Sequence, residues 1–222
     1  MKDGYLKHGD CMDFFKELDD NSIDLVLTDI PYDIVNRSSN GLRNLDKSKA
    51  DVLTFNIKDF VSECYRVAKT TIIFCGTEQI STIHGQFAEY QKKNKGTVRQ
   101  IIWEKTNPSP MNGEYIYLRG IENAVWFKKR GGTFNARCKN PVFKYPIGKS
   151  KVHPTEKNHN LLKELILDNS NPGDIVCDPC MGSASTGICA IELGRIFYGC
   201  ELDEQWFNIA KERIDNTKLM TF

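Results

Sequence analysis

Residues 23–32, Ile-Asp-Leu-Val-Leu-Thr-Asp-Ile-Pro-Tyr, decide the fold. The run IDLVL is almost continuously apolar, which is typical of a strand in a parallel sheet that is covered on both faces. A carboxylate, a proline and an aromatic ring follow it directly, as Asp29, Pro31 and Tyr32. Because the ligand crevice of an open parallel sheet lies outside the carboxyl ends of its strands, these three residues are predicted to lie at a binding site.

Similar apolar runs recur along the chain and alternate with helical patterns. Strands are expected at residues 5–8, 23–29, 71–75, 98–103, 122–127, 174–178 and 195–200, and helices at 11–18, 59–69, 77–91, 156–169, 183–193 and 203–215. This alternation predicts an α/β domain with a mostly parallel sheet. Two polar, turn-rich stretches interrupt it, 33–57 and 128–152, and loops of this length are usually binding or lid elements.

The chain of 222 residues, 40% hydrophobic, is long enough for one sizeable core. It has neither a run of about 20 apolar residues nor an apolar stretch behind a basic start, so we expect no membrane span, no signal peptide and a cytoplasmic location. Several of the eight cysteines fall in apolar runs, which favours a reducing compartment. Cys177 and Cys180 form a lone CxxC without a second pair, so no metal site is expected.

Charge is distributed unevenly along the chain. The net charge is only +1, from 30 basic and 29 acidic residues, which taken alone argues against a strongly basic nucleic-acid-binding protein. The segment 128–151, however, holds eight basic residues and no Asp or Glu. A basic stripe on an otherwise acidic body predicts a polyanionic partner, and a solvated lysine-rich loop is the alternative.

Residues 178–187, DPCMGSASTG, follow an apolar strand and open a helix. Small residues in such a turn let backbone N–H groups approach a nucleotide-like ligand closely. A Walker phosphate loop and a GxGxxG dinucleotide fingerprint are both excluded, because their sequences are missing. Glu201 ends the next strand, where an acidic residue is placed to hold ribose hydroxyls, although a plain surface glutamate would fit the same position.

Three segments together resemble one protein family. Residues 29–32 (DIPY) resemble the catalytic [DNS]-P-P-[YFW] motif of amino-methyltransferases that use S-adenosylmethionine. Residues 178–187 resemble their D-P-F-x-G-S-G-[TS]-[TS] cofactor loop, and residues 153–157 (HPTEK) resemble their H-P-T-E-K-P segment. The order of the motifs, with a G-D-C-like start at residues 9–11, resembles the permuted β-group of DNA amino-methyltransferases. The chain departs from these patterns at Ile30, Asn158, Cys180 and Ala184.

The resemblance implies a fold for the whole chain, residues 1–222, as a single domain. It implies a Rossmann-like methyltransferase fold, with a circularly permuted motif order and a seven-stranded sheet that has one antiparallel strand. The antiparallel pairing would come from the strands at 98–103 and 122–127. The stretch 33–57 would form a loop beside the catalytic motif, and 128–152 would be the target recognition region.

The resemblance also implies roles for individual residues. The catalytic set would be Asp29, Ile30, Pro31 and Tyr32. The Asp29 carboxylate and the Ile30 carbonyl would accept the N–H groups of a base amino group, and Tyr32 would stack on the extruded base. Cofactor contacts would come from Asp10, Cys11, Asp29, His153, Thr155, Lys157, Asp178, Cys180, Gly182, Ser183, Ala184, Glu201 and Leu202. Thr155 is also a good helix N-cap, and Lys157 could receive the cofactor's carboxylate.

The implied activity is methylation of adenine N6 in double-stranded DNA, with S-adenosyl-L-methionine as methyl donor. DNA contacts are expected from Arg37, Arg43, Lys128, Lys129, Arg130, Arg137, Lys139 and Lys144. A cognate restriction endonuclease, a homodimer and a prokaryotic or phage origin are consistent with the family.

Rival activities follow from the same motifs. Cytosine-N4 methylation is the nearest, and an aspartate at the first motif position favours adenine over it. Methylation of RNA or of a protein glutamine amide uses a similar catalytic site, but enzymes of that kind usually place the cofactor loop before the catalytic motif. A catalytically impaired DNA-binding homologue would account for the departures at Ile30, Cys180 and Ala184.

Overall fold

The computed structural model describes residues 4–32, 53–110, 113–148 and 156–221. Its strands are β1 (Tyr5–His8), β2 (Ile23–Asp29), β3 (Ala68–Cys75), β4 (Thr97–Lys105), β5 (Ile121–Lys128), β6 (Val142–Tyr145), β7 (Ile175–Asp178) and β8 (Ile196–Glu201). The helices are α1 (Cys11–Phe15), α2 (Ile57–Val67), α3 (Ile80–Lys92), α4 (His159–Asn169), α5 (Ser185–Glu192) and α6 (Glu204–Thr221). Within the described residues, no helix is both long enough and apolar enough to cross a membrane.

All these strands form one sheet in the order β1-β8-β7-β2-β3-β5-β4-β6. Neighbouring strands are parallel except where β5 pairs with β3 and β4, so among the described strands β5 alone runs against the others. The expected α/β class and the antiparallel pairing are confirmed, but the sheet has eight strands rather than seven. The additional strand is β6, which lies inside the stretch 128–152 that was expected to be a loop.

The strand β6 could not be read from composition because it is short and lies among turn residues. It pairs with β4 at the edge of the sheet, where Val142 aligns with Ile102 and Tyr145 with Lys105. Only one of its side chains, that of Phe143, is buried. A four-residue edge strand with one buried side chain carries almost no hydrophobic pattern, so the pairing partner decides its conformation.

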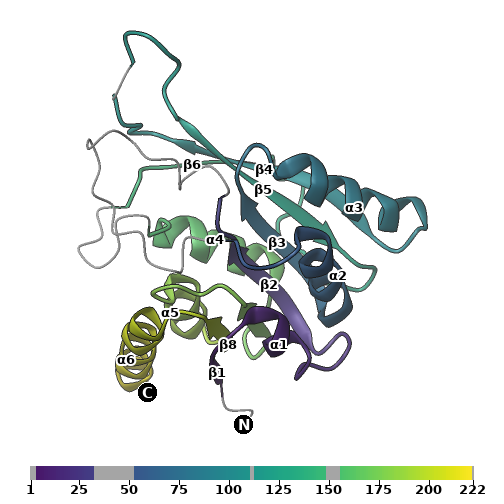
Figure 1. Ribbon diagram of the computed structural model, residues 1–222, viewed down its shortest axis with the longest axis vertical. Coiled ribbons are helices and arrows are strands. Elements are labelled where there is room, and N and C mark those ends of the chain that lie inside the picture. The colour runs from purple at the N-terminus through teal and green to yellow at the C-terminus, as the bar shows by residue number, and fades with distance from the viewer. Residues whose placement is uncertain (1–3, 33–52, 111–112, 149–155, 222) are drawn as a thin grey trace.

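Helices cover both faces of the sheet and divide the core into two (Figure 1). One core cluster packs α1, α2 and α3 against the sheet and includes Phe60 and Phe87. The other packs α4, α5 and α6 against the opposite face and includes Leu165 and Ile191. Burial on both faces accounts for the continuous apolar runs of β2 and β3.

Side-chain caps fix where two of the helices begin. Asn56 accepts from the backbone N–H of Lys58 and caps α2, while Asn158 accepts from Asn160 and Leu161 and caps α4. Each such cap contributes about 1 kcal/mol. The cap on α4 corrects the prediction for that helix, which begins at His159 and not near Thr155. It also gives a role to Asn158, which replaces the last proline of the family pattern.

The order of strands places a crevice between β2 and β7. From this pair the chain proceeds to β3 on one side and to β8 on the other, which is the topological switch point where open α/β sheets bind ligands. Asp29 ends β2 and Asp178 ends β7. Thr28 donates a 2.7 Å hydrogen bond to Asp178 Oδ1 across the two strands. Two of the sequence motifs therefore meet at this crevice.

Because β5 is antiparallel, it begins at the carboxyl edge of the parallel strands and ends at their amino edge. Its first residues lie at the carboxyl edge of the parallel strands, beside Cys75, which aligns with Asn123. Its last residue, Lys128, aligns with Thr70 and Thr97 near the amino ends of β3 and β4. Residues that follow Lys128 consequently start at the amino edge of the sheet, opposite the carboxyl edge where Asp29 lies.

Candidate active site

The carboxylate of Asp29 is the centre of a hydrogen-bond network at the carboxyl edge. Its Oδ1 accepts from the Tyr32 hydroxyl at 2.9 Å, and its Oδ2 accepts from the Lys157 ammonium at 2.5 Å. Burial, together with the neighbouring Asp29 charge, raises the pKa of Tyr32 well above its ordinary value, so the hydroxyl keeps its proton and donates. The structure thus brings together the first and last residues of the DIPY motif and the lysine of HPTEK.

The Lys157 ammonium lies between two acidic side chains. It is 2.8 Å from Glu122 Oε2 as well as 2.5 Å from Asp29 Oδ2, and its side chain is only 10% exposed. Burial lowers the pKa of Lys157, but the Asp29 and Glu122 carboxylates and the neighbouring Tyr32 outweigh burial and raise it well above the ordinary value. The lysine therefore carries its charge at neutral pH. Its predicted contact with a cofactor carboxylate stays a prediction.

The backbone of the DIPY motif is fixed from both sides. Ile30 donates its N–H to the Phe74 carbonyl at 3.2 Å, and its side chain is 1% exposed within the core. Burial of this side chain supplies the rigidity that a proline ring gives in the family pattern. On the other side, the Gln79 amide donates to the Pro31 carbonyl at 2.9 Å and accepts from the Gly76 N–H at 2.8 Å.

The loop after β7 has a conformation that small residues favour. Gly182 has a φ of 51°, and a side chain built on it would meet no atom within 4 Å. Ala184 also takes the left-handed conformation, with a φ of 61°, immediately before α5. Left-handed backbone costs about 1–2 kcal/mol for a residue with a β-carbon, which explains why the family pattern has glycine where this chain has Ala184.

Asp178 fixes the start of this loop through hydrogen bonds. It is 4% exposed, and its Oδ1 accepts from the Thr28 hydroxyl at 2.7 Å and from the Cys180 N–H at 3.1 Å. Burial raises the pKa of Asp178 to about 7, against the two hydrogen bonds, which favour the ionised form. These contacts tie the catalytic strand to the loop.

Glu201 joins the same loop to the end of β8. Its Oε2 accepts from the Gly182 N–H at 2.8 Å and its Oε1 from the Asp203 N–H at 2.8 Å, and burial raises its pKa. A carboxylate oxygen can accept two hydrogen bonds, so Glu201 keeps the capacity to accept from ribose hydroxyls. The surface-glutamate alternative is wrong, because the residue is 5% exposed.

The candidate site combines the Asp29–Tyr32 pair, the small-residue loop after β7 and the acidic end of β8. Sequence comparison then identifies the family of the chain. The profile of a family described as DNA methylase matches residues 23–212. The chain belongs to the DNA methylase family. Its predicted family resemblance is confirmed.

Relatives in this family match nearly the whole chain. The Type II methyltransferase M.HinfI of Haemophilus influenzae is 28% identical and covers 95% of this chain, which spans 68% of that protein. The DNA adenine methyltransferase YhdJ of Escherichia coli K12 is 29% identical over 94% of this chain and 81% of its own length. A crystal structure of an M1.HpyAVI–SAM complex matches with a TM-score of 0.72 and 28% identity, covering 95% of this chain and 98% of its own.

Those of the remaining predicted cofactor residues that the structure describes lie around the same edge. Asp10 accepts from the Met12 N–H at 2.7 Å and caps α1, Cys11 is buried, and Cys180 is half-buried. Ser183 is buried, and Leu202 is 38% exposed beyond the end of β8. His153 and Thr155 lie outside the described residues. That these side chains touch a cofactor stays a prediction.

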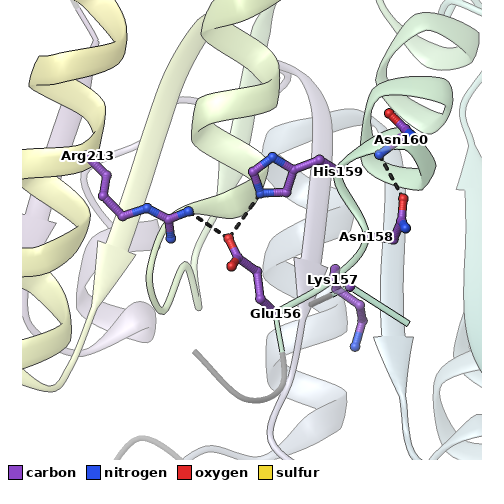
Figure 2. A pocket seen from close by; sticks show the side chains of 7 residues that line it. Glu156, Lys157, Asn158, His159, Asn160 and Arg213 are labelled. Atoms are coloured by element: carbon purple, nitrogen blue, oxygen red, sulfur yellow. Dashed lines mark hydrogen bonds and ion pairs between the residues drawn. The ribbon is translucent and has the colours of Figure 1, made fainter. Parts of the chain in front are cut away.

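A second polar cluster lies beside the loop, where sequence reasoning had assigned nothing to Glu156, His159 or Arg213. Figure 2 shows Arg213 and His159 pointing toward Glu156, whereas Lys157 turns away from them. Glu156 Oε1 lies 2.7 Å from the Arg213 guanidinium, 3.0 Å from His159 Nε2 and 2.7 Å from the Ser185 hydroxyl. Glu156, His159 and Arg213 line a pocket of about 300 Å³. The cluster ties α6 and the start of α5 to the segment before α4.

The predicted DNA-binding residues are not all at the carboxyl edge. Lys129, after the end of β5, donates to Asn21 Oδ1 at 2.6 Å and packs over the Tyr65 ring at 4.4 Å. Burial lowers the pKa of Lys129 to about 8. Lys128 donates to the Gly132 carbonyl, and Arg130 donates to Asn94. This group lies at the amino edge, away from Asp29.

The other predicted DNA contacts differ in their surroundings. Lys139 forms ion pairs with Glu164 and Asp168 on α4 at 2.6 and 2.5 Å. Lys144 lies on β6, aligned with Glu104 near the end of β4, and its side chain is 65% exposed. Arg137 lies between β5 and β6, and Arg37 and Arg43 lie outside the described residues. Lys144 is therefore the predicted contact that the strand register places near the catalytic edge.

Two residues that hold the site were missed by sequence reasoning, Glu122 and Gln79. Glu122 begins an apolar strand and Gln79 precedes a helix, and neither position carries a local pattern of a binding residue. Both reach the site only because β3 lies next to β2 and β5 lies next to β3 in the sheet. The signal that finds them is the strand order, which one sequence does not contain.

Proposed function

We propose that this protein is a DNA methyltransferase that transfers the methyl group of S-adenosyl-L-methionine to N6 of adenine. The observation that carries the proposal is the Asp29 carboxylate beside the Tyr32 ring at the switch point, next to the small-residue loop after β7. The family membership and the adenine methyltransferase among the relatives support it.

The residues around the loop fit the cofactor. The space above Gly182 is open, Ala184 turns the backbone into α5, and the Glu201 carboxylate is positioned for hydroxyl donors. These features suit a nucleoside with a ribose and an extended tail. When bound, the cofactor supplies an electrophilic methyl group.

The chain's own residues orient and activate the substrate. An exocyclic amino nitrogen is a weak nucleophile because its lone pair is conjugated with the ring. The Asp29 carboxylate and the Ile30 carbonyl would accept its two N–H groups and favour a more tetrahedral nitrogen. Tyr32 would stack on the base after it leaves the duplex, and the nitrogen's surplus proton would pass to Asp29 or to water.

Adenine is favoured over cytosine because Asp29 occupies the first motif position and because YhdJ, 29% identical, is named a DNA adenine methyltransferase. The cytosine-N4 methyltransferase of PvuII has a TM-score of 0.70 with 13% identity, which is a likeness of fold alone. An impaired homologue, suggested by the altered residues Ile30, Cys180 and Ala184, is the other alternative; the buried Ile30 side chain and the left-handed backbone of Ala184 support the active enzyme over it.

The test is to express the chain in a methylation-deficient bacterium and to sequence its DNA with modification detection. Nucleoside mass spectrometry of the same DNA identifies the base. We expect N6-methyladenine at one short recognition sequence, and none with Asp29→Ala. N4-methylcytosine would establish the alternative, and unmodified DNA together with the absence of S-adenosylmethionine binding would overturn the proposal.

We also propose that double-stranded DNA is the partner that approaches the carboxyl edge. A cognate restriction endonuclease is supported by the Type II methyltransferases among the relatives. Self-association into a homodimer is a further expectation from the family, and sedimentation of the purified protein with and without DNA measures it.

A further inference from the structure

The Lys157 ammonium contacts two carboxylates in different ways. It forms ion pairs with both, 2.5 Å from Asp29 Oδ2 and 2.8 Å from Glu122 Oε2, and only the contact with Asp29 has the alignment of a hydrogen bond. That Glu122 oxygen is buried and accepts no hydrogen bond within the described part of the chain. Lys157 thus donates to the Asp29 carboxylate and lies beside a second carboxylate oxygen that has no aligned donor.

The position of the ammonium conflicts with the proposed substrate. Lys157 lies 5.7 Å from the centre of the Tyr32 ring and 5.2 Å from that of Phe74, so the ammonium is close to both rings as well as to Asp29. The target amino group would need the same carboxylate. It also becomes cationic as it is methylated, and a neighbouring ammonium would oppose that charge.

Glu122 is built to hold a cation beside this space. It is the second residue of β5, and the antiparallel direction of that strand places it at the catalytic edge. Its Oε1 is 2.7 Å from the ammonium of Lys105 on the adjacent strand, and the two side chains are 20% and 13% exposed. Burial raises the pKa of Glu122, but Lys157 and Lys105 outweigh burial and lower it, so the carboxylate is ionised.

We propose that Glu122 is a positioning residue that draws the Lys157 ammonium away from Asp29 when the target amino group enters. The inference rests on the proposed function. Lys157 needs to move only toward the unused Glu122 oxygen, which is already within ion-pair distance. Asp29 then accepts from the amino group, and Glu122 balances the charge of Lys157 while the amino nitrogen becomes cationic.

The first experiment compares Glu122→Gln with the wild-type protein in single-turnover methylation of duplex DNA. The amide keeps the shape of Glu122 but no longer balances the ammonium, so Lys157 should remain on Asp29. We expect the transfer rate to fall about 10- to 100-fold, while the dissociation constant for S-adenosylmethionine in calorimetry changes less than about twofold. Glu122→Asp, which retains the charge, should recover part of the rate.

The second experiment tests whether Glu122 acts through Lys157. Without the ammonium, Glu122 has nothing to draw away, so Lys157→Met and the double variant Glu122→Gln/Lys157→Met should transfer methyl groups at equal rates. A purely structural role of Glu122 predicts instead that the two losses multiply. The cycle therefore separates positioning from stability.

A readout besides activity follows base entry. Duplex DNA with 2-aminopurine beside the target adenine becomes more fluorescent when that adenine leaves the stack. We expect a clear rise with the wild-type protein, a smaller rise with Glu122→Gln, and recovery in the double variant, because Lys157 no longer blocks Asp29.

Glu192→Gln is the matched control, since it breaks a lysine–glutamate pair of the same 2.8 Å length between α4 and α5. It should leave the transfer rate unchanged. A wild-type rate in Glu122→Gln, or multiplying losses in the cycle, would overturn the inference while the wild-type protein remains active. A wild-type protein that methylates no DNA would instead overturn the proposed function, so the two failures are distinguishable.

Discussion

The Asp29 carboxylate has a donor on each oxygen, and the two donors differ in kind. Tyr32 is a neutral hydroxyl three residues away, while Lys157 is a cation from a distant part of the chain. This asymmetry orients the Asp29 carboxylate but makes the surroundings of its Oδ2 dependent on where the lysine lies. Single-residue changes at this site therefore separate binding of the cofactor from activation of the base.

Asp29→Ala removes the acceptor for the target amino group. We expect the methyl-transfer rate to fall at least about 100-fold, because the nitrogen loses the group that polarises it. The dissociation constant for S-adenosylmethionine should stay within about threefold, since Asp178 and Glu201 still hold the loop. A radiolabel transfer assay and calorimetry measure the two quantities, and retention of full activity would contradict the assigned role.

The raised pKa of Asp178 makes the stability of the protein depend on pH. The folded pKa of about 7 lies above the ordinary value of 3.8, so protonation of this carboxyl favours the fold. The protonated carboxyl contributes at most about 4 kcal/mol to the free energy of unfolding. This contribution is complete below pH 3.8 and is lost as the pH rises through 7. Urea unfolding between about pH 5 and 8 should show a smaller fall in unfolding free energy for Asp178→Asn than for the wild-type protein. Equal slopes would contradict the prediction.

Residues could be predicted from the sequence where local chemistry suffices. Asp29 and Tyr32 follow a buried strand, and the loop at 178–187 carries its small residues in one run. The conformation of Ala184 and the burial of Ile30 could not be predicted, since each depends on packing. The partner of Lys157 was unpredictable for another reason: Glu122 reaches it through the order of strands.

At the scale of elements, close packing between α5 and β8 shapes the cofactor loop. A β-carbon on Gly187 would come within 2.6 Å of the Phe197 ring, so the helix lies on the strand without space for a methyl group. By contrast, a β-carbon on Gly85 in α3 would meet nothing within 4 Å. The two glycines form a matched pair for testing how tightly the loop is held.

Gly187→Ala should lower the free energy of unfolding by about 1–3 kcal/mol, because the methyl group forces α5 away from the sheet. It should also weaken S-adenosylmethionine binding, since α5 carries the loop. Gly85→Ala should raise the free energy of unfolding by about 0.5–1 kcal/mol and leave binding unchanged. Denaturant titration and calorimetry check both variants, and a neutral Gly187→Ala would show that the helix shifts freely.

The direction of β5 separates the basic residues into two groups. Lys144 lies near the catalytic edge, whereas Arg130 lies beyond the opposite one. We expect Lys144→Gln to reduce the salt dependence of DNA binding by about one counterion, and Arg130→Gln to leave it unchanged. Anisotropy titrations from about 50 to 200 mM salt, the range over which such slopes are read, distinguish the two. A reduced salt dependence in Arg130→Gln, with no change in Lys144→Gln, would instead support Arg130 as a DNA contact.

The sequence predicted every described strand except β6, a four-residue edge strand among turn residues with one buried side chain. The predicted strand at 23–29 has the bounds of β2, because seven residues with a buried pattern leave little freedom. The helix predicted at 183–193 differs from α5 only at its ends, where the loop geometry decides. The basic stripe was real as a sequence feature, but the chain's path divides it between two edges of the sheet.

At the scale of the whole molecule, the two halves of the chain interleave in one sheet. The strands β7 and β8 come from the last third of the chain and lie between β1 and β2. The catalytic motif and the cofactor loop are consequently far apart in sequence, yet one hydrogen bond of 2.7 Å, between residues 150 positions apart, joins their strands. The function depends on this insertion.

Because β1 lies at the edge of the sheet, the segments of the chain could be joined in a different order. A β-carbon on Gly4, directly before β1, would come 3.8 Å from the Lys218 ammonium of α6, so the start of β1 lies near the last helix. A short linker could therefore join α6 to β1, with new termini opened after β6 and before His153, so that the HPTEK segment stays intact. Such a rearranged protein would be translated with its cofactor loop first and its catalytic strand later. Since every strand keeps its neighbours, it should bind S-adenosylmethionine with unchanged affinity, and the motif order would be a record of ancestry rather than a requirement of the chemistry.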